Sequence, residues 1–217
     1  MRMLRLTVFV LAGAVALAAP SGAQNCVGRG SFRYGRVALG GTVTVTGGSR
    51  GFGAYGTYGT PASWYAGATV GTTSIDGGGG TSLNLGGSLG YQLPIGRALA
   101  FCPYANLGSS ALRNVSTITG TRITTRTNSY GLGGTLGWRY EDSDELDVIP
   151  ALGVQWQRIS VTSPELRYSG PANSGSASFS IGFIAERKWA IVPAVSSSFS
   201  SGTSYVYSLS VGYSFGK

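Results

Sequence analysis

Large apolar residues alternate one by one with small or polar residues along much of this chain. The clearest case is the segment YVYSLSVGYSF at 205–215, where every second residue is aromatic or aliphatic and most of the others are Ser or Gly. A period of two places successive side chains on opposite faces of a β-strand. The pattern therefore predicts strands with one apolar face and one small, weakly polar face.

The same alternation recurs along the chain and predicts ten strands. Each has about the length that a membrane-spanning strand needs, roughly 9–11 residues. The predicted ranges are 36–46, 50–59, 63–74, 81–92, 97–108, 128–140, 147–159, 175–186, 189–199 and 205–216. A second interpretation keeps only the eight strands after residue 62 and treats the residues before them as an N-terminal arm.

The N-terminus has the pattern of a secretory signal peptide. Arg2 and Arg5 precede an apolar run at 8–19, and small residues follow as far as Ala23. This order of basic, apolar and small residues is typical of a cleaved export signal. We therefore predict a signal peptide at 1–23, a periplasmic arm at 24–35 and the strand-forming domain at 36–217.

The low charge content indicates whether the apolar faces of the strands lie in a protein core or against lipid. Only 11% of the residues are charged, against about 25% in an ordinary soluble domain. A soluble sandwich or barrel would carry Lys and Glu on its outer face, whereas the second face here carries mainly Gly, Ser, Ala and Thr. An exported, β-patterned chain with so few charges fits a closed transmembrane barrel. The predicted fold class is an all-β, antiparallel, up-and-down transmembrane β-barrel.

Connection lengths also alternate in the predicted order of strands. Short links at 94–96, 141–146 and 187–188 alternate with long links at 109–127 and 160–174. Outer-membrane barrels have short periplasmic turns and long external loops. The pattern predicts that the chain ends on the periplasmic side.

The last seven residues, VGYSFGK, resemble the C-terminal insertion signal of bacterial outer-membrane β-barrel proteins. Gly212, Tyr213 and Phe215 fit the signal, and Lys217 stands where the signal ends in an aromatic residue. The resemblance implies a small barrel of the OmpA and OmpX type, in the porin-like class. It also implies a Gram-negative outer membrane and insertion by the barrel-insertion machinery.

The chain contains no histidine, the side chain that most readily supplies a base near pH 7. The two cysteines and scattered acids form no metal-ligand pattern, and the Gly-rich runs are not followed by a helix pattern. We predict no catalytic, metal or cofactor site, and hence a structural or surface-interaction role. A narrow passive pore for ions or small solutes is the alternative, and an enzyme based on carboxylates is a third hypothesis.

Cys26 and Cys102 are the only cysteines. The periplasm is oxidising, so a disulfide that pins the arm at the periplasmic mouth is predicted. The alternative is two unpaired thiols. Arg139 and Glu186 are expected near the periplasmic ends of inward faces, where they would pair and gate the lumen or stay unrelated mouth residues.

Arg113, Arg122 and Arg126 fall in the predicted external loop 109–127, which holds no acid. Their guanidinium groups suit the phosphates of lipopolysaccharide, and a solvated basic loop is the alternative interpretation. The basic residues do not form the aromatic-interleaved patch of a nucleic-acid site. The expected partners are outer-membrane lipid, lipopolysaccharide and the insertion machinery, and the barrel is expected to be a monomer.

Overall fold

The computed structural model describes residues 37–60, 63–78, 80–96, 98–115, 122–141, 146–163, 168–186, 188–199 and 204–215. The predicted signal peptide, the predicted arm and Cys26 lie outside these described residues.

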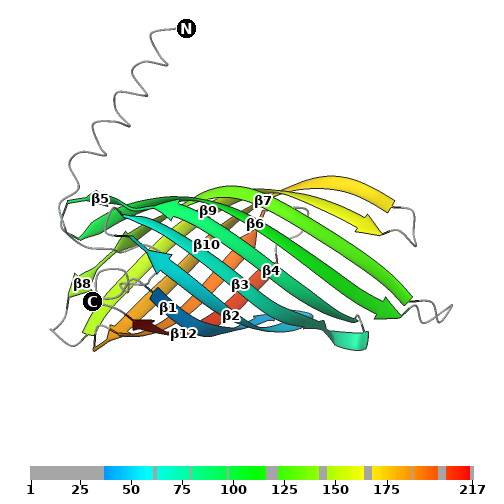
Figure 1. The fold of residues 1–217 in the computed structure, drawn as a ribbon, viewed down its shortest axis with the longest axis horizontal. Helices are drawn as coiled ribbons and strands as arrows, with labels where there is room; N and C mark the ends of the chain where they lie inside the picture. The colour runs from blue at the N-terminus through cyan, green and yellow to red at the C-terminus, as the bar shows by residue number, and fades with distance from the viewer. Residues whose placement is uncertain are drawn as a thin grey trace, which may run out of the picture.

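Ten long antiparallel strands close into a barrel (Figure 1). They are β1 (Val37–Thr46), β2 (Ser49–Gly59), β3 (Trp64–Ile75), β4 (Gly80–Tyr91), β6 (Leu99–Val115), β7 (Arg122–Trp138), β9 (Leu146–Ser163), β10 (Tyr168–Ala185), β11 (Trp189–Ser198) and β12 (Tyr205–Phe215). Two short strands, β5 (Leu93–Ile95) and β8 (Tyr140–Glu141), follow β4 and β7, and the 3-10 turn η2 (Asp76–Gly78) joins β3 to β4.

The first and last strands close the ring. β1 pairs with β12 in a continuous ladder from Val37 opposite Phe215 to Thr46 opposite Val206. Because β1 and β2 stand between β12 and β3 in the ring, the interpretation with eight strands is wrong and the one with ten is confirmed. The connections between the ring strands are short at both ends of the barrel. The end that holds Val37 and Phe215 is called the periplasmic end below, after the expectation from the sequence that the chain ends on the periplasmic side.

Pro103, Pro150 and Pro193 interrupt the ladders near the periplasmic end. Proline cannot donate a ladder hydrogen bond, and on one side of each strand the pairing is interrupted for two positions at the proline. At Pro103 the flanking pairs are Gly90 with Tyr104 and Leu93 with Phe101, which leave two residues on each strand. The register is therefore unchanged, and no bulge accommodates the proline.

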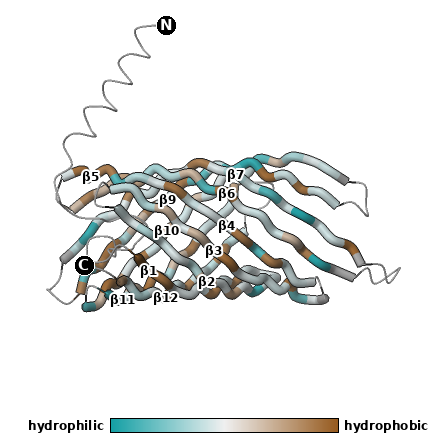
Figure 2. Tube along the Cα trace, viewed as in Figure 1, coloured by the Kyte–Doolittle hydropathy of each residue, from teal (hydrophilic) through white to brown (hydrophobic). Residues whose placement is uncertain are grey.

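The outside of the barrel carries exposed large apolar side chains from every ring strand, and Figure 2 shows hydrophobic positions separated by paler, less hydrophobic ones along the strands. Outward Leu132, Leu152 and Val154 are 61–64% exposed to the surroundings of the barrel. Such exposure would be costly in water but is favourable in hydrocarbon. Among the described residues, no helix is long and apolar enough to cross a membrane.

Inside, bulky or polar side chains stand directly opposite glycines. Tyr55 is paired with Gly40, Tyr104 with Gly133, and Asn106 with Gly131. A Cβ on Gly131 would lie 2.6 Å from the carbonyl oxygen of Trp156 and 2.8 Å from Oδ1 of Asn106, so a larger residue does not fit there. At these three pairs the glycine leaves room for the side chain opposite it.

Four strands are much longer than expected. β6, β7, β9 and β10 have 17 or 18 residues, whereas the other ring strands have 10–12. The predicted long loops 109–127 and 160–174 are therefore wrong: most of their residues continue the strands, and only 116–121 and 164–167 lie between them. The extensions form a sheet on one side of the barrel, roughly 20 Å long along the strands.

Candidate functional site

The lumen is the candidate site, and two clusters of buried side chains lie at its periplasmic end. Ile149, Ile184 and Ala190, from three adjacent strands, form a buried cluster with 0–4% exposure. Tyr65, Ala100 and Cys102 form a second buried cluster, against which Tyr104 packs. Together the two clusters are called the periplasmic layer below.

The periplasmic layer contains a buried ion pair. Nη2 of Arg139 donates hydrogen bonds to both carboxylate oxygens of Asp147, at 3.0 and 2.9 Å. Both side chains are at most 8% exposed. Asp147 lies opposite Ile184 in the ladder between β9 and β10, so the pair adjoins the apolar cluster.

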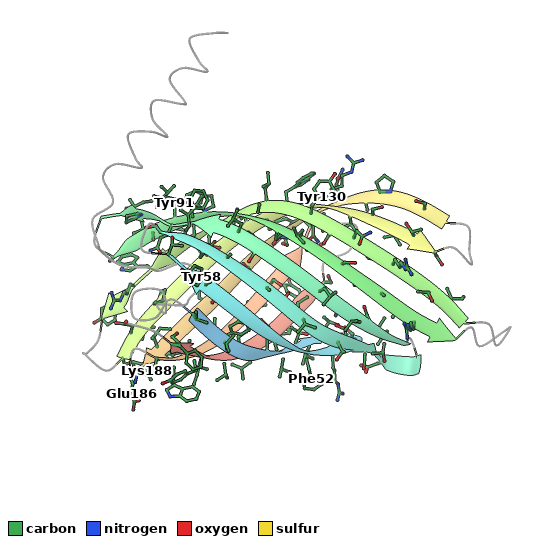
Figure 3. All side chains as sticks on the ribbon, viewed as in Figure 1. Phe52, Tyr58, Tyr91, Tyr130, Glu186 and Lys188 are labelled. Atoms are coloured by element: carbon green, nitrogen blue, oxygen red, sulfur yellow. The ribbon has the colours of Figure 1, made fainter. Side chains whose placement is uncertain are left out.

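The predicted gate partner Glu186 is not at this pair. Glu186 lies exposed in the turn between β10 and β11, with a φ of 50°. Figure 3 shows Glu186 and Lys188 together at that end of the barrel. The partner of Arg139 is thus corrected from Glu186 to Asp147. The sequence held a usable signal, because Asp147 shares the inward parity of Ile149 and Ala151.

Cys102 lies where the sequence placed it, on the inward face near the periplasmic end of β6, and is fully buried. The predicted partner, Cys26, lies outside the described residues. The disulfide therefore stays a prediction.

The lumen above the periplasmic layer is polar and uncharged. A cavity of about 270 Å³ lies against β3, β4, β6, β7 and β9. It is lined by Gly67, Thr69, Gly86, Gly87, Ser88, Asn106, Leu107, Gly108, Ser129 and Gln157. The charged side chains of Arg139 and Asp147 lie in the layer below and not at this cavity.

Hydrogen bonds fix the polar side chains next to the cavity. The Tyr104 hydroxyl donates to Oε1 of Gln155, and Nε2 of Gln155 donates to Oε1 of Gln157, each at 3.2 Å. On the neighbouring wall, Ser82 donates to Asn84, which in turn donates to Thr73. The amide oxygen and nitrogen positions of this network are therefore defined by their partners.

The predicted lipid-binding arginines lie on strands and not in a loop. Arg113 on β6 and Arg126 on β7 are exposed and face outward, above the apolar belt. Arg122 begins β7, but its side chain lies outside the described residues. Arg158 on β9 is also exposed and outward, and the sequence analysis missed it because it fell at the end of a predicted spanning strand.

The part of the chain that the structure describes contains no group of three His, Cys, Asp or Glu side chains arranged to hold a metal ion.

No family model and no curated protein matches this chain. Among solved structures, the β domain of the Bordetella autotransporter BrkA is similar, with a TM-score of 0.55 at 14% identity over 83% of this chain and 84% of that one. The chain has the fold of outer-membrane β-barrel proteins.

Two further similar structures are barrels of this kind with lower scores. The KdgM porin has a TM-score of 0.45 at 10% identity over 82% of this chain and 99% of the porin. The attachment invasion locus protein Ail of Yersinia pestis has a TM-score of 0.39 at 11% identity, over 82% and 95%. At these identities the likeness extends to the barrel fold and not to a function.

Proposed function

We propose that this chain is a non-enzymatic, integral β-barrel of a bacterial outer membrane, exported with a cleaved signal peptide and closed to free diffusion at its periplasmic end. Its role is structural or in surface interaction. The apolar outer belt supports the membrane location, and the absence of histidine from the sequence supports a role without acid–base catalysis.

The periplasmic layer is the observation that carries this proposal. Ile149, Cys102 and Ala100 point into the lumen, yet all three are 0% exposed. A water-filled channel would leave such inward side chains accessible to solvent. Thr69, which also points inward but lies farther from the periplasmic end, is exposed. Protein interiors packed in this way have few voids larger than a water molecule.

Single-channel recording tests the closure. The mature chain, refolded and inserted in planar lipid bilayers, is expected to give no discrete conductance steps. Heat-modifiable gel migration of the same preparation shows that the barrel is folded. Steady steps from the wild-type barrel would contradict closure and favour the second candidate function, a narrow passive pore, to which the uncharged polar lumen is suited.

The surface role is supported by the sheet that projects beyond the apolar belt. On β7 the outward side chains are apolar from Tyr130 to Trp138, but Asn128 and Arg126 follow above Tyr130. Arg113 lies opposite Thr124, so Arg113 and Arg126 occupy diagonal positions on one face, about 7–8 Å apart at Cα. Two guanidinium groups at this spacing suit one phosphate of lipopolysaccharide.

Replacing both arginines with glutamine, R113Q with R126Q, is expected to weaken lipopolysaccharide binding about tenfold at low salt. The reason is the loss of charge-assisted hydrogen bonds to phosphate. Binding is measured by titrating lipopolysaccharide into the detergent-folded barrel and following tryptophan fluorescence. R50Q, which removes an exposed outward arginine on β2, is the control. An equal loss in the control, or equal binding of dephosphorylated lipopolysaccharide, would contradict the assignment.

The proposed Cys26–Cys102 disulfide would tie the N-terminal arm to the periplasmic layer. Cys26 precedes Val37 by 11 residues, and such a segment reaches up to roughly 35 Å. Cys102 lies four strand spacings from β1 around the ring, or about 19 Å. Gel migration of the unfolded chain with and without reductant distinguishes the disulfide from two thiols.

A further inference from the structure

The lumen cavity contains polar groups that the fold does not use. Thr69, Ser88, Asn106 and Ser129 line the cavity, and none of their side chains takes part in a hydrogen bond within the described part of the chain. Next to the cavity, Tyr104, Gln155 and Gln157 form a hydrogen-bonded chain with one another. Three hydroxyls and one amide are thus available to a solute.

The register gathers these groups on one stretch of wall. Ser88 and Asn106 are paired directly between β4 and β6. Gln157 and Asn106 flank Gly131 from the two neighbouring strands. In the adjacent row, Thr69 and Ser129 flank the paired glycines Gly86 and Gly108. Polar side chains therefore surround a part of the wall that consists of glycines and has no side chains.

The chemistry of the lining selects the class of solute. Hydroxyl and amide groups both donate and accept hydrogen bonds, which matches a ligand whose own groups do both. The cavity wall offers no charged side chain, so an ionic solute would lose hydration without gaining a partner. Its volume of about 270 Å³ is close to the smallest typical ligand pockets, at roughly 300 Å³.

We propose that this cavity binds an uncharged, hydroxyl-rich solute of the size of a small saccharide. Asn106 and Gln157 provide the amide contacts from one row, and Thr69 and Ser129 provide hydroxyls from the other. The glycines at 67, 86 and 108 let the solute approach the backbone. This binding goes beyond the proposed surface role and does not require that the barrel conducts.

Saturation-transfer NMR on the full barrel in detergent tests the proposal, with maltose as the uncharged probe and glucuronate at pH 7 as the charged one. Maltose is expected to show saturable transfer, and glucuronate is not. The double variant N106L with Q157L is expected to bind maltose about tenfold more weakly, from the loss of two or more hydrogen bonds. N128L, which changes an outward residue on β7 beside Ser129, is the control and is expected to bind as the wild type does.

A second variant fills the cavity without removing a polar group. A Cβ on Gly108 would approach the flexible Ser129 hydroxyl at 2.8 Å, and the nearest backbone atom is 3.7 Å away. G108L is therefore expected to fold, which heat-modifiable migration checks, and to lose maltose binding. No transfer to the wild type would overturn the proposal, as would equal binding of glucuronate or unchanged maltose binding in both lumen variants. Conductance is measured in a separate experiment. The proposed closure of the periplasmic end and the proposed solute binding are therefore tested independently.

Discussion

Replacing Asp147 with asparagine is expected to lower the free energy of unfolding of the barrel by about 3–5 kcal/mol. The substitution removes the charge that faces Arg139, whose side chain is only 5% exposed. The buried guanidinium then loses the charge of Asp147 and both hydrogen bonds to that carboxylate while it stays desolvated. The measurement is urea unfolding of the barrel in phospholipid vesicles, followed by tryptophan fluorescence.

Two further variants isolate the cause. E186Q removes an exposed acid at the same end of the barrel and is expected to change the unfolding free energy by at most about 0.5 kcal/mol. The apolar double variant R139M with D147L removes both charges and is expected to recover most of the lost stability, because no unpaired charge stays buried. A loss below about 1 kcal/mol in D147N would contradict a structural role for the ion pair.

Replacing Ile149 and Ile184 together with alanine is expected to open the periplasmic layer. Both side chains are at most 2% exposed and contact each other between β9 and β10, so their truncation leaves a connected void. Beside it lie Arg139 and Asp147, whose charges favour the entry of water. In planar bilayers the double variant is expected to show discrete conductance steps where the wild type shows none.

The control for this experiment removes similar apolar volume from the outer face. L152A with V154A truncates two outward side chains on β9 and leaves the lumen unchanged, so it is expected to stay silent. Heat-modifiable migration checks folding, because each buried truncation costs roughly 2–5 kcal/mol. Steps of equal size in the control would mean that membrane defects, and not the lumen, carry the current. A silent lumen variant would contradict the assignment of closure to these isoleucines.

The spanning segments were predictable residue by residue. The range 36–46 was predicted as the first strand and β1 is Val37–Thr46, and 205–216 corresponds to β12 (Tyr205–Phe215). The alternation also predicted correctly that Leu132 and Val154 point outward. In a membrane each residue of a spanning strand meets either lipid or the lumen, so solvent contact alternates with a period of two and leaves its mark on the sequence.

The extensions of the long strands were not predictable in this way. Beyond the belt the outer face carries polar residues such as Ser109, Arg126 and Ser160, and the inner face mixes polar residues with a few apolar ones such as Leu112. The alternation of apolar and polar residues stops there although the backbone pairing continues. The hydropathy pattern therefore predicted loops for these segments. Backbone pairing, which leaves no mark in the hydropathy pattern, holds these strands together.

The sequence by itself determined the pattern of strands and the apolar exterior of the barrel. It also determined that no side chain of the lumen is a histidine. Only the tertiary structure decided that Arg139 pairs with Asp147, and that Asn106 and Gln157 meet across Gly131 around one cavity. The physical reason is that a strand's pattern records which solvent each side chain faces, a property of single positions. Register and closure are collective, because each depends on every hairpin in the ring, and only they determine which inward side chains become neighbours.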